Sequence, residues 1–307
     1  MVIQDTDSLR LAICEHRLGN QFNVFAQVRL PSITLNYRAQ EAVTAASLVK
    51  LYILEAVAEQ LSNSTISPST IVVVQKEKIV SGSGLLKYAN SNIDLDVNAL
   101  ILLMMSYSDN TAANSLIELV GIQKIQEYIA RSKLDSTRFA RRMMDQSDGS
   151  RKENVTSASD VCKTYFRISE SQIAEELSSF SFLKNSFTGL YGCEKFAGSS
   201  IDEHIKAVIR AKNPDGLLHY MNNSRVKRDY PRLGKFIDPE KFIFSKPATG
   251  RNVFHDSILL TVPGGVLAAT VMITSNEADF SRPDHKSYIE ATHLMNDLGM
   301  FINSLVQ

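Results

Sequence analysis

The sequence predicts an α+β protein in which an antiparallel β-sheet with flanking terminal helices carries an inserted all-helical domain. Strand-like patterns occur near the N-terminus and again after Pro239, whereas apolar residues at helical spacing fill the middle of the chain. A further helix pattern closes the chain. We therefore expect a discontinuous sheet domain of residues 1–45 and 240–307 and a helical domain of residues 46–239.

The composition is that of a folded globular protein. Of 307 residues, 44% are hydrophobic and 21% are charged, which argues against a disordered chain. Lys and Arg together number 33, as do Asp and Glu, so no net charge attracts a polyanion and a nucleic acid partner is disfavoured. Cys14, Cys162 and Cys193 form no CxxC pair, so we expect buried thiols.

The first residues, MVIQDTDSLRLAICEHR, contain no long apolar run after a basic start. This pattern argues against a signal peptide and against a membrane span. We expect a cytoplasmic protein as the sequence stands, or a periplasmic or extracellular one if these residues begin the mature part of an exported chain. The oligomeric state stays open.

The first half of the chain changes from strand to helix patterns. LRLAIC and FNVFAQV, between Leu9 and Val28, alternate in polarity and predict two strands joined across the turn-rich residues 17–20. Residues 42–61 carry apolar side chains at three- and four-residue spacing, which predicts a helix with Thr44 as its cap. Further helices are expected at 98–107, 111–119, 123–132, 158–168 and 204–211.

The last part of the chain returns to strands. FIFSKPATG, VFHDSILLTV and VLAATVMIT predict three of them, and the turn at residues 263–265 makes the last two a long hairpin. A closing helix over residues 286–306 is expected to use one face, formed by Ile289, Leu294, Leu298, Ile302 and Leu305. Residues 169–213 fit this plan least well.

Most of the familiar catalytic signatures are absent, including GxSxG, GxxxxGK[ST], GxGxxG and HExxH. The motif Ser47-Leu48-Val49-Lys50 lies at the beginning of a predicted helix. Because positions i and i+3 share a helix face, the Lys50 amine can reach the Ser47 hydroxyl and act as its base. Apolar neighbours favour a partly neutral lysine, and helix N-terminal amides stabilise developing negative charge.

Two more motifs follow in order. Ser108-Asp109-Asn110 lies between two predicted helices and by itself is only a good N-cap. The strand motif KPATG, residues 246–250, lies beside the predicted hairpin. The order and separation of the three motifs, rather than any single one, indicate a catalytic site.

With these motifs the sequence resembles the class A β-lactamases and the wider penicillin-recognising serine hydrolases. The resemblance covers most of the chain and rests on SxxK, SDN and a variant K-T-G, together with AASLVKLYILEAV, GSGLLKY and LILLMMSYSDNTAANSLIELVG. It implies the β-lactamase/transpeptidase-like fold, with the site between the two domains. It also implies an enzyme for a small-molecule or peptide-like substrate. We expect no cofactor and no metal ion.

The resemblance assigns a role to each motif residue. Ser47 would be the nucleophile that forms an acyl-enzyme with an amide, β-lactam or ester, and Lys50 would accept its proton. Ser108 would relay a proton to the leaving nitrogen. Asn110 would hold the substrate amide, while Asp109 would tie down its own loop.

The strand motif would bind the rest of the substrate. Thr249 would contact the substrate carboxylate, and Gly250 would belong to the same substrate-binding strand. The backbone amides of Ser47 and Arg251 would form the oxyanion hole. If Thr249 anchors the motif, Ala248 stands where the family has lysine. Lys246 lies two residues earlier, on the same side of a strand about 6.6 Å away, and could partly substitute. Arg251 is another source of positive charge.

A second departure concerns deacylation. The resembling enzymes use a loop glutamate to activate water, whereas the corresponding stretch here reads RRMMD and lacks an E-x-x-L-N pattern. Asp145 and Glu153 are the local carboxylates, and we interpret both as loop or salt-bridge residues. The separation of about two hundred residues between Ser47 and Thr249 exceeds the family norm, which places an insertion in residues 169–213.

The remaining candidates are interpreted as structural. His255-Asp256 is expected to be a strand pair rather than a metal or catalytic site. The methionines are expected to fill the core, and they are Met104, Met105, Met143 and Met144.

Three functions compete. The first is a serine hydrolase of this fold, the second an acyltransferase or DD-peptidase-like enzyme with poor deacylation, and the third a non-catalytic binding protein. Complete SxxK and SDN motifs favour an enzyme, because a binding protein has no physical need for a base beside a serine. The altered strand motif and the missing loop glutamate argue against efficient β-lactam hydrolysis, so the physiological substrate stays open.

Overall fold

The computed structural model describes residues 9, 13, 22–145, 152–170, 232–238 and 241–306. Six strands of these residues form one antiparallel sheet in the order β2-β1-β10-β9-β7, with β8 also paired to β9. They are β1 (Asn23–Arg29), β2 (Thr34–Tyr37), β7 (Phe242–Ser245), β8 (Ala248–Gly250), β9 (Val253–Val262) and β10 (Gly265–Thr274). Because β1 and β10 are neighbours, both ends of the chain build the sheet, as the sequence predicts.

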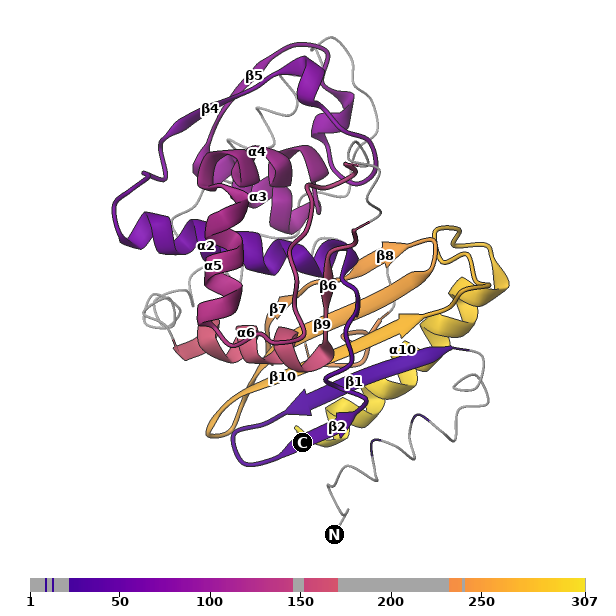
Figure 1. The fold of residues 1–307 in the computed structure, drawn as a ribbon. Coiled ribbons are helices and arrows are strands. Elements are labelled where there is room, and N and C mark those ends of the chain that lie inside the picture. The colour runs from indigo at the N-terminus through magenta and orange to yellow at the C-terminus, as the bar shows by residue number, and fades with distance from the viewer. Residues whose placement is uncertain are drawn as a thin grey trace.

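Helices from the middle of the chain cover one face of the sheet, and α10 (Lys286–Ser304) covers the other (Figure 1). The middle helices are α2 (Lys50–Ser62), α3 (Val97–Ser106), α4 (Asn110–Val120), α5 (Ile122–Arg131) and α6 (Ala158–Glu170). Two small sheets join them, β3 (Val43–Thr44) with β6 (Val155–Thr156) and β4 (Ile71–Val74) with β5 (Ile93–Asp96). The α+β prediction is therefore confirmed.

Strand alternation divides the apolar side chains of the sheet between two cores. Phe25 and Met272 belong to the core on the α6 side, whereas Val24 and Phe254 belong to the core on the α10 side. Successive strand residues point to opposite faces. A sheet covered on both faces needs apolar residues at nearly every position, and nine of the ten β9 residues are buried.

Helix α3 brings the second motif to its place. Asn98 is its one half-buried member among the residues 97–105, and the others are buried. A helix that is apolar on all sides has to lie inside the protein. Because α3 ends at Ser106, Ser108 follows directly from a buried helix and lies near α2.

The predicted N-terminal hairpin is wrong. The two described residues of its first strand, Leu9 and Ile13, have helical backbone and are buried in the α10-side core. Apolar residues four apart share a helix face, so LRLAIC fits the spacing of a helix as well as the alternation of a strand. Packing against the rest of the protein selects the helix. The hairpin that exists joins β1 and β2, and the predicted turn at residues 17–20 lies outside the described residues.

Two details of the predicted helices also need correction. Thr44 does not cap a helix, because it lies in β3 opposite Val155, and the helical backbone begins only at Ala46. In α10, Ile289 is 46% exposed, whereas Leu294, Leu298 and Ile302 are buried. The apolar face is completed by Tyr288, Ala291 and Met295.

The predicted helix 204–211 and most of the predicted insertion at 169–213 lie outside the described residues. The division into residues 1–45 with 240–307 and residues 46–239 stays a prediction. Across the described ranges, no helix is both long and apolar enough to span a membrane.

Candidate active site

Ser47 lies in a single 3₁₀ turn, Ala46–Val49, that leads directly into α2. Ala46 has a φ of 44°, a left-handed conformation that costs free energy in a non-glycine residue. The backbone amide of Ala45 donates to the Asn154 carbonyl at 2.8 Å, which fixes the approach to this turn. Strand β8 packs against the turn and brings the third motif beside Ser47.

The Lys50 side chain is fully buried, and its amine faces four oxygen atoms. Nζ lies 3.4 Å from Ser47 Oγ, 2.5 Å from the Ser108 carbonyl, 3.1 Å from Ser108 Oγ and 2.8 Å from Asn110 Oδ1. Ser108 Oγ in turn donates to Ser47 Oγ at 2.9 Å. A buried amine needs such partners. The first and second motifs therefore form one hydrogen-bonded cluster.

The Ser108 loop is held in an uncommon conformation by its neighbour. Ser108 has a φ of 53°. The buried Asp109 carboxylate accepts from the amide of Ala112 at 3.0 Å, which caps α4, and from the amide of Leu86 at 2.8 Å. Burial raises the pKa of Asp109. Both bonds fasten the loop, as expected for this residue.

Two glycines allow the GSGLLKY loop to pack on the second motif. Gly82 and Gly84 have φ values of 90° and 120°. A Cβ on Gly84 would lie 2.2 Å from Asp109 Oδ2, and one on Gly82 would lie 2.6 Å from Asn110 Nδ2. This close approach lets Asn110 Nδ2 donate to the Ser81 carbonyl at 3.1 Å. Only glycine fits both the conformation and the space.

Arg232 is a site neighbour that the sequence analysis misses. Its Nη2 donates to the Thr249 hydroxyl and its Nη1 to the His255 carbonyl. The guanidinium lies 4.2 Å from the centre of the Phe254 ring. Arg232 is buried. Its hydrogen bond to Thr249 therefore places a buried positive charge beside the strand motif.

The strand register places the side chains of Lys246 and Thr249 on opposite faces of the strand. The Lys246 amide donates to the Ser257 carbonyl at 2.8 Å, and Ala248 is paired with His255. Because side chains alternate along a strand, Lys246 and Ala248 share a face, and Thr249 points to the opposite one. The Lys246 side chain is buried, with 1% of its surface exposed.

Gly250 and Arg251 follow at the end of β8. Gly250 lies opposite Val253. Arg251 is exposed, and its carbonyl accepts from the Phe280 amide at 2.8 Å.

His255 and Asp256 are buried in the sheet. The Nδ1 atom of His255 accepts from the Ile273 amide at 3.2 Å, so Nε2 carries the proton and donates to the Thr44 carbonyl at 2.9 Å. Burial lowers the pKa of His255 to about 4 and raises that of Asp256 to about 6. Within the described ranges, no three His, Cys, Asp or Glu residues are close enough to bind a metal ion.

The loop that follows α5 is fastened at three points. Asn154 accepts from the amides of Ala140 and Arg141 at 2.7 and 3.0 Å and donates to the Arg141 carbonyl at 2.9 Å. Asn114 forms a pair of hydrogen bonds with the backbone of Met143, at 2.8 and 3.0 Å. Arg141 forms an ion pair with Glu153 at 2.8 Å.

The four methionines divide in their environments. Met104 and Met105 are fully buried in the core, as predicted. Met143 is only half-buried, and Met144 is 49% exposed with a φ of 61°. The core-filling prediction is therefore wrong for Met144, because this loop follows the surface. Cys162 is a buried free thiol, whereas Cys14 and Cys193 lie outside the described residues.

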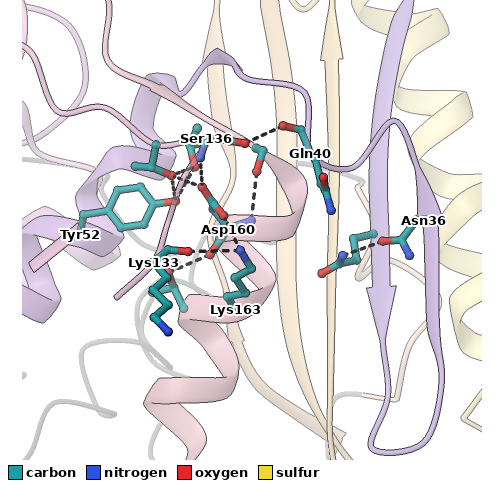
Figure 2. Close-up of polar contacts among 12 residues, drawn as sticks. Asn36, Gln40, Tyr52, Lys133, Ser136, Asp160 and Lys163 are labelled. Atoms are coloured by element: carbon teal, nitrogen blue, oxygen red, sulfur yellow. Dashed lines mark hydrogen bonds and ion pairs between the residues drawn. The ribbon is translucent and has the colours of Figure 1, made fainter. Parts of the chain in front are cut away.

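A polar network around Asp160 connects the beginning of α6 to the segment that follows α5 (Figure 2). The Asp160 carboxylate accepts from the Ser136 amide and from Thr137 Oγ1, both at 2.9 Å, and from Lys163 Nζ at 3.1 Å. Tyr52 OH lies 2.5 Å from Thr156 Oγ1. The network thus joins the beginning of α6 to the segment after α5 and to α2, two residues beyond Lys50.

Comparison with known proteins identifies the family of this chain. The family model described as the beta-lactamase enzyme family matches residues 14–184. The chain therefore belongs to this family, within the superfamily of β-lactamase-like serine hydrolases. No curated protein matches.

Several solved structures share the fold. A β-lactamase from Sphaerobacter thermophilus is 19% identical with a TM-score of 0.71, and the alignment covers 98% of each chain. PBP-A is 16% identical with a TM-score of 0.68, covering 98% of this chain and 97% of that one. An acyl-enzyme complex of a PBP-A point mutant with penicillin G is 16% identical with a TM-score of 0.70, and the alignment covers 98% of this chain and 97% of that one.

Proposed function

We propose that this protein is a serine hydrolase that forms an acyl-enzyme on Ser47 with an amide, β-lactam or ester. The observation that carries the proposal is the hydrogen-bonded cluster of Ser47, Lys50 and Ser108, which come from two separate segments and meet around one buried amine. A structural role does not require a lysine to share its amine with two hydroxyl groups. A nucleophilic serine does require a base within reach.

The acylation step uses these three residues. Neutral Lys50 takes the Ser47 proton while Oγ bonds to the substrate carbonyl carbon, and the carbonyl oxygen becomes an oxyanion. The backbone amides of Ser47 and Arg251 would stabilise that charge. When the carbon–nitrogen bond breaks, the proton returns from Lys50 through the Ser108 hydroxyl to the leaving nitrogen. For an ester, the leaving oxygen receives it.

The remaining motif residues would bind the substrate. Asn110 would hold the substrate amide, and Thr249 would contact a carboxylate along the strand that continues through Gly250. The positive charge for that carboxylate has three candidate sources, which are Arg232, Arg251 and Lys246. Arg232 already contacts the Thr249 hydroxyl, so it is the best placed of them.

A second candidate is transfer of the acyl group to an amine rather than to water. The loop held by Asn114 presents Met143 and Met144, neither of which can activate water. The nearby Glu153 carboxylate is in an ion pair with Arg141. Slow hydrolysis of the acyl-enzyme leaves time for an amine nucleophile to attack it.

A labelling experiment tests the proposal. The protein is incubated with a fluorescent penicillin or a fluorophosphonate, and its intact mass is measured. We expect one adduct on the natural sequence and on the control variant Ser62→Ala, which alters an exposed serine at the far end of α2, the helix that follows Ser47. Ser47→Ala should form none. Equal labelling of Ser47→Ala would place the nucleophile elsewhere and overturn the proposal.

The two candidate reactions are separated by following the adduct after removal of excess probe. Release that accelerates in proportion to an added amine supports acyl transfer. Release at one rate with or without the amine supports hydrolysis alone.

A further inference from the structure

Met144 combines exposure with a strained backbone. Almost half of its surface is exposed, and its φ of 61° lies in the left-handed region that methionine rarely adopts. A single exposed apolar side chain is ordinary. A strained conformation, in contrast, persists only where the surrounding contacts determine it.

The contacts of the loop place Met144 beside the proposed active site. Asn110 and Asn114 are four residues apart, so they lie on the same face of α4 on successive turns. Asn110 accepts from Lys50 Nζ, and Asn114 holds the backbone of Met143. The loop therefore runs along the helix face that also carries the cluster around Lys50.

The space next to Gly82 shows how close the Met144 side chain lies to Asn110. A Cβ on Gly82 would lie 2.6 Å from Asn110 Nδ2, 3.5 Å from Met144 Sδ and 3.8 Å from Met144 Cε. The amide of Asn110 and the thioether of Met144 thus border the same small space. Asn110 is the residue that we assign to the substrate amide.

The loop around Met144 is rigidly attached. Asn154 clamps the backbone of Ala140 and Arg141, and Arg141 Nη1 donates to the Asp145 carbonyl at 3.3 Å. With Asn114 bound to Met143, the residues on both sides of Met144 are fixed. The backbone that carries the thioether is consequently held beside the site before substrate binds.

We propose that Met144 is a specificity-determining residue whose thioether contacts the acyl group of the substrate. It would favour acyl groups that carry an apolar side chain next to the amide bound by Asn110. The proposal rests on acylation of Ser47. Methionine suits this role because its flexible, polarizable side chain adapts to apolar groups of different shape.

The test compares two thioesters that share a leaving group, one with a phenylacetylglycyl and one with an acetylglycyl acyl group, so that both carry an amide for Asn110. The quantity measured is the ratio of their kcat/KM values for acylation of Ser47. Met144→Gly relieves the strained φ while it removes the apolar contact. We expect the preference for phenylacetylglycyl to fall about tenfold, the scale at which apolar pockets discriminate, with no loss of thermal stability.

Three further variants complete the design. Met144→Asn also tolerates a left-handed φ and should lower the preference as well, whereas Met144→Leu should retain it. Met300→Ala removes a comparably exposed methionine from α10 and should change nothing. If Ser47 is acylated but the ratio stays the same in Met144→Gly and Met144→Asn, the specificity proposal alone is wrong. If Ser47 is never acylated, the proposed function is wrong and this inference fails with it.

Discussion

Replacing Glu55 by glutamine should stabilise the protein at alkaline pH and leave its stability unchanged at acid pH. Glu55 lies on α2 and accepts a hydrogen bond from Tyr128 OH at 3.1 Å, whereas its Oε1 atom is buried with no hydrogen-bond partner. Burial raises the pKa of Glu55 to about 7, more than the opposing effects of Tyr128 and Arg167 lower it. Glu59 raises it slightly further.

The pH range and the magnitude follow from linkage. The raised pKa contributes stability that is fully present below the unfolded value of 4.5 and is lost as the pH rises through 7. One pKa unit corresponds to about 1.4 kcal/mol, so the shift amounts to at most about 3.5 kcal/mol at pH 8. The Glu55 residue as a whole is partly exposed. We therefore expect Glu55→Gln to raise the free energy of unfolding by about 2 kcal/mol at pH 8.

Urea unfolding of both proteins between pH 4 and 8 measures this difference. The gain from Glu55→Gln should shrink steadily below pH 7 and approach zero near pH 4. Tyr128→Phe serves as a second variant, because loss of its hydrogen bond should raise the pKa of Glu55 further and move the transition to higher pH. A gain that is constant across this range would refute the reasoning, since it would not come from ionisation of Glu55.

Three other predictions concern the proposed reaction. Lys50→Ala should abolish covalent labelling of Ser47 by a β-lactam, as judged by intact mass, while circular dichroism shows a folded protein. With the natural sequence, the β-lactam should give a burst followed by slow release, and steady hydrolysis without an adduct would mean that another residue activates water. Lys246→Ala and Arg232→Ala should be compared on carboxylate-bearing substrates and on neutral esters. The residue that binds the carboxylate should lose about 1.5–3 kcal/mol of binding on the former alone, whereas equal losses on both would indicate a structural role.

Elements whose local pattern and burial agree could be predicted from the sequence. Helices α3, α4, α5 and α6 lie within two residues of their predicted bounds, because each carries an apolar pattern that only a helix can bury. LRLAIC is ambiguous because Leu9 and Ile13 fit both a strand and a helix face. Thr44 looks like a cap in sequence, yet pairing with β6 uses it as a strand residue.

The candidate site shows the same division between local and distant relations. Lys50 reaches Ser47 because they are three positions apart on helical backbone and therefore share a face, which is a local rule. The contact of Arg232 with Thr249 depends on how the chain returns to the sheet, and no periodicity in the sequence encodes that path. Met144 differs again, because its exposure follows from the bonds that Asn114 makes to the preceding residue. A sequence pattern can therefore locate a nucleophile and its base, while the groups that surround the substrate are set by contacts between distant segments.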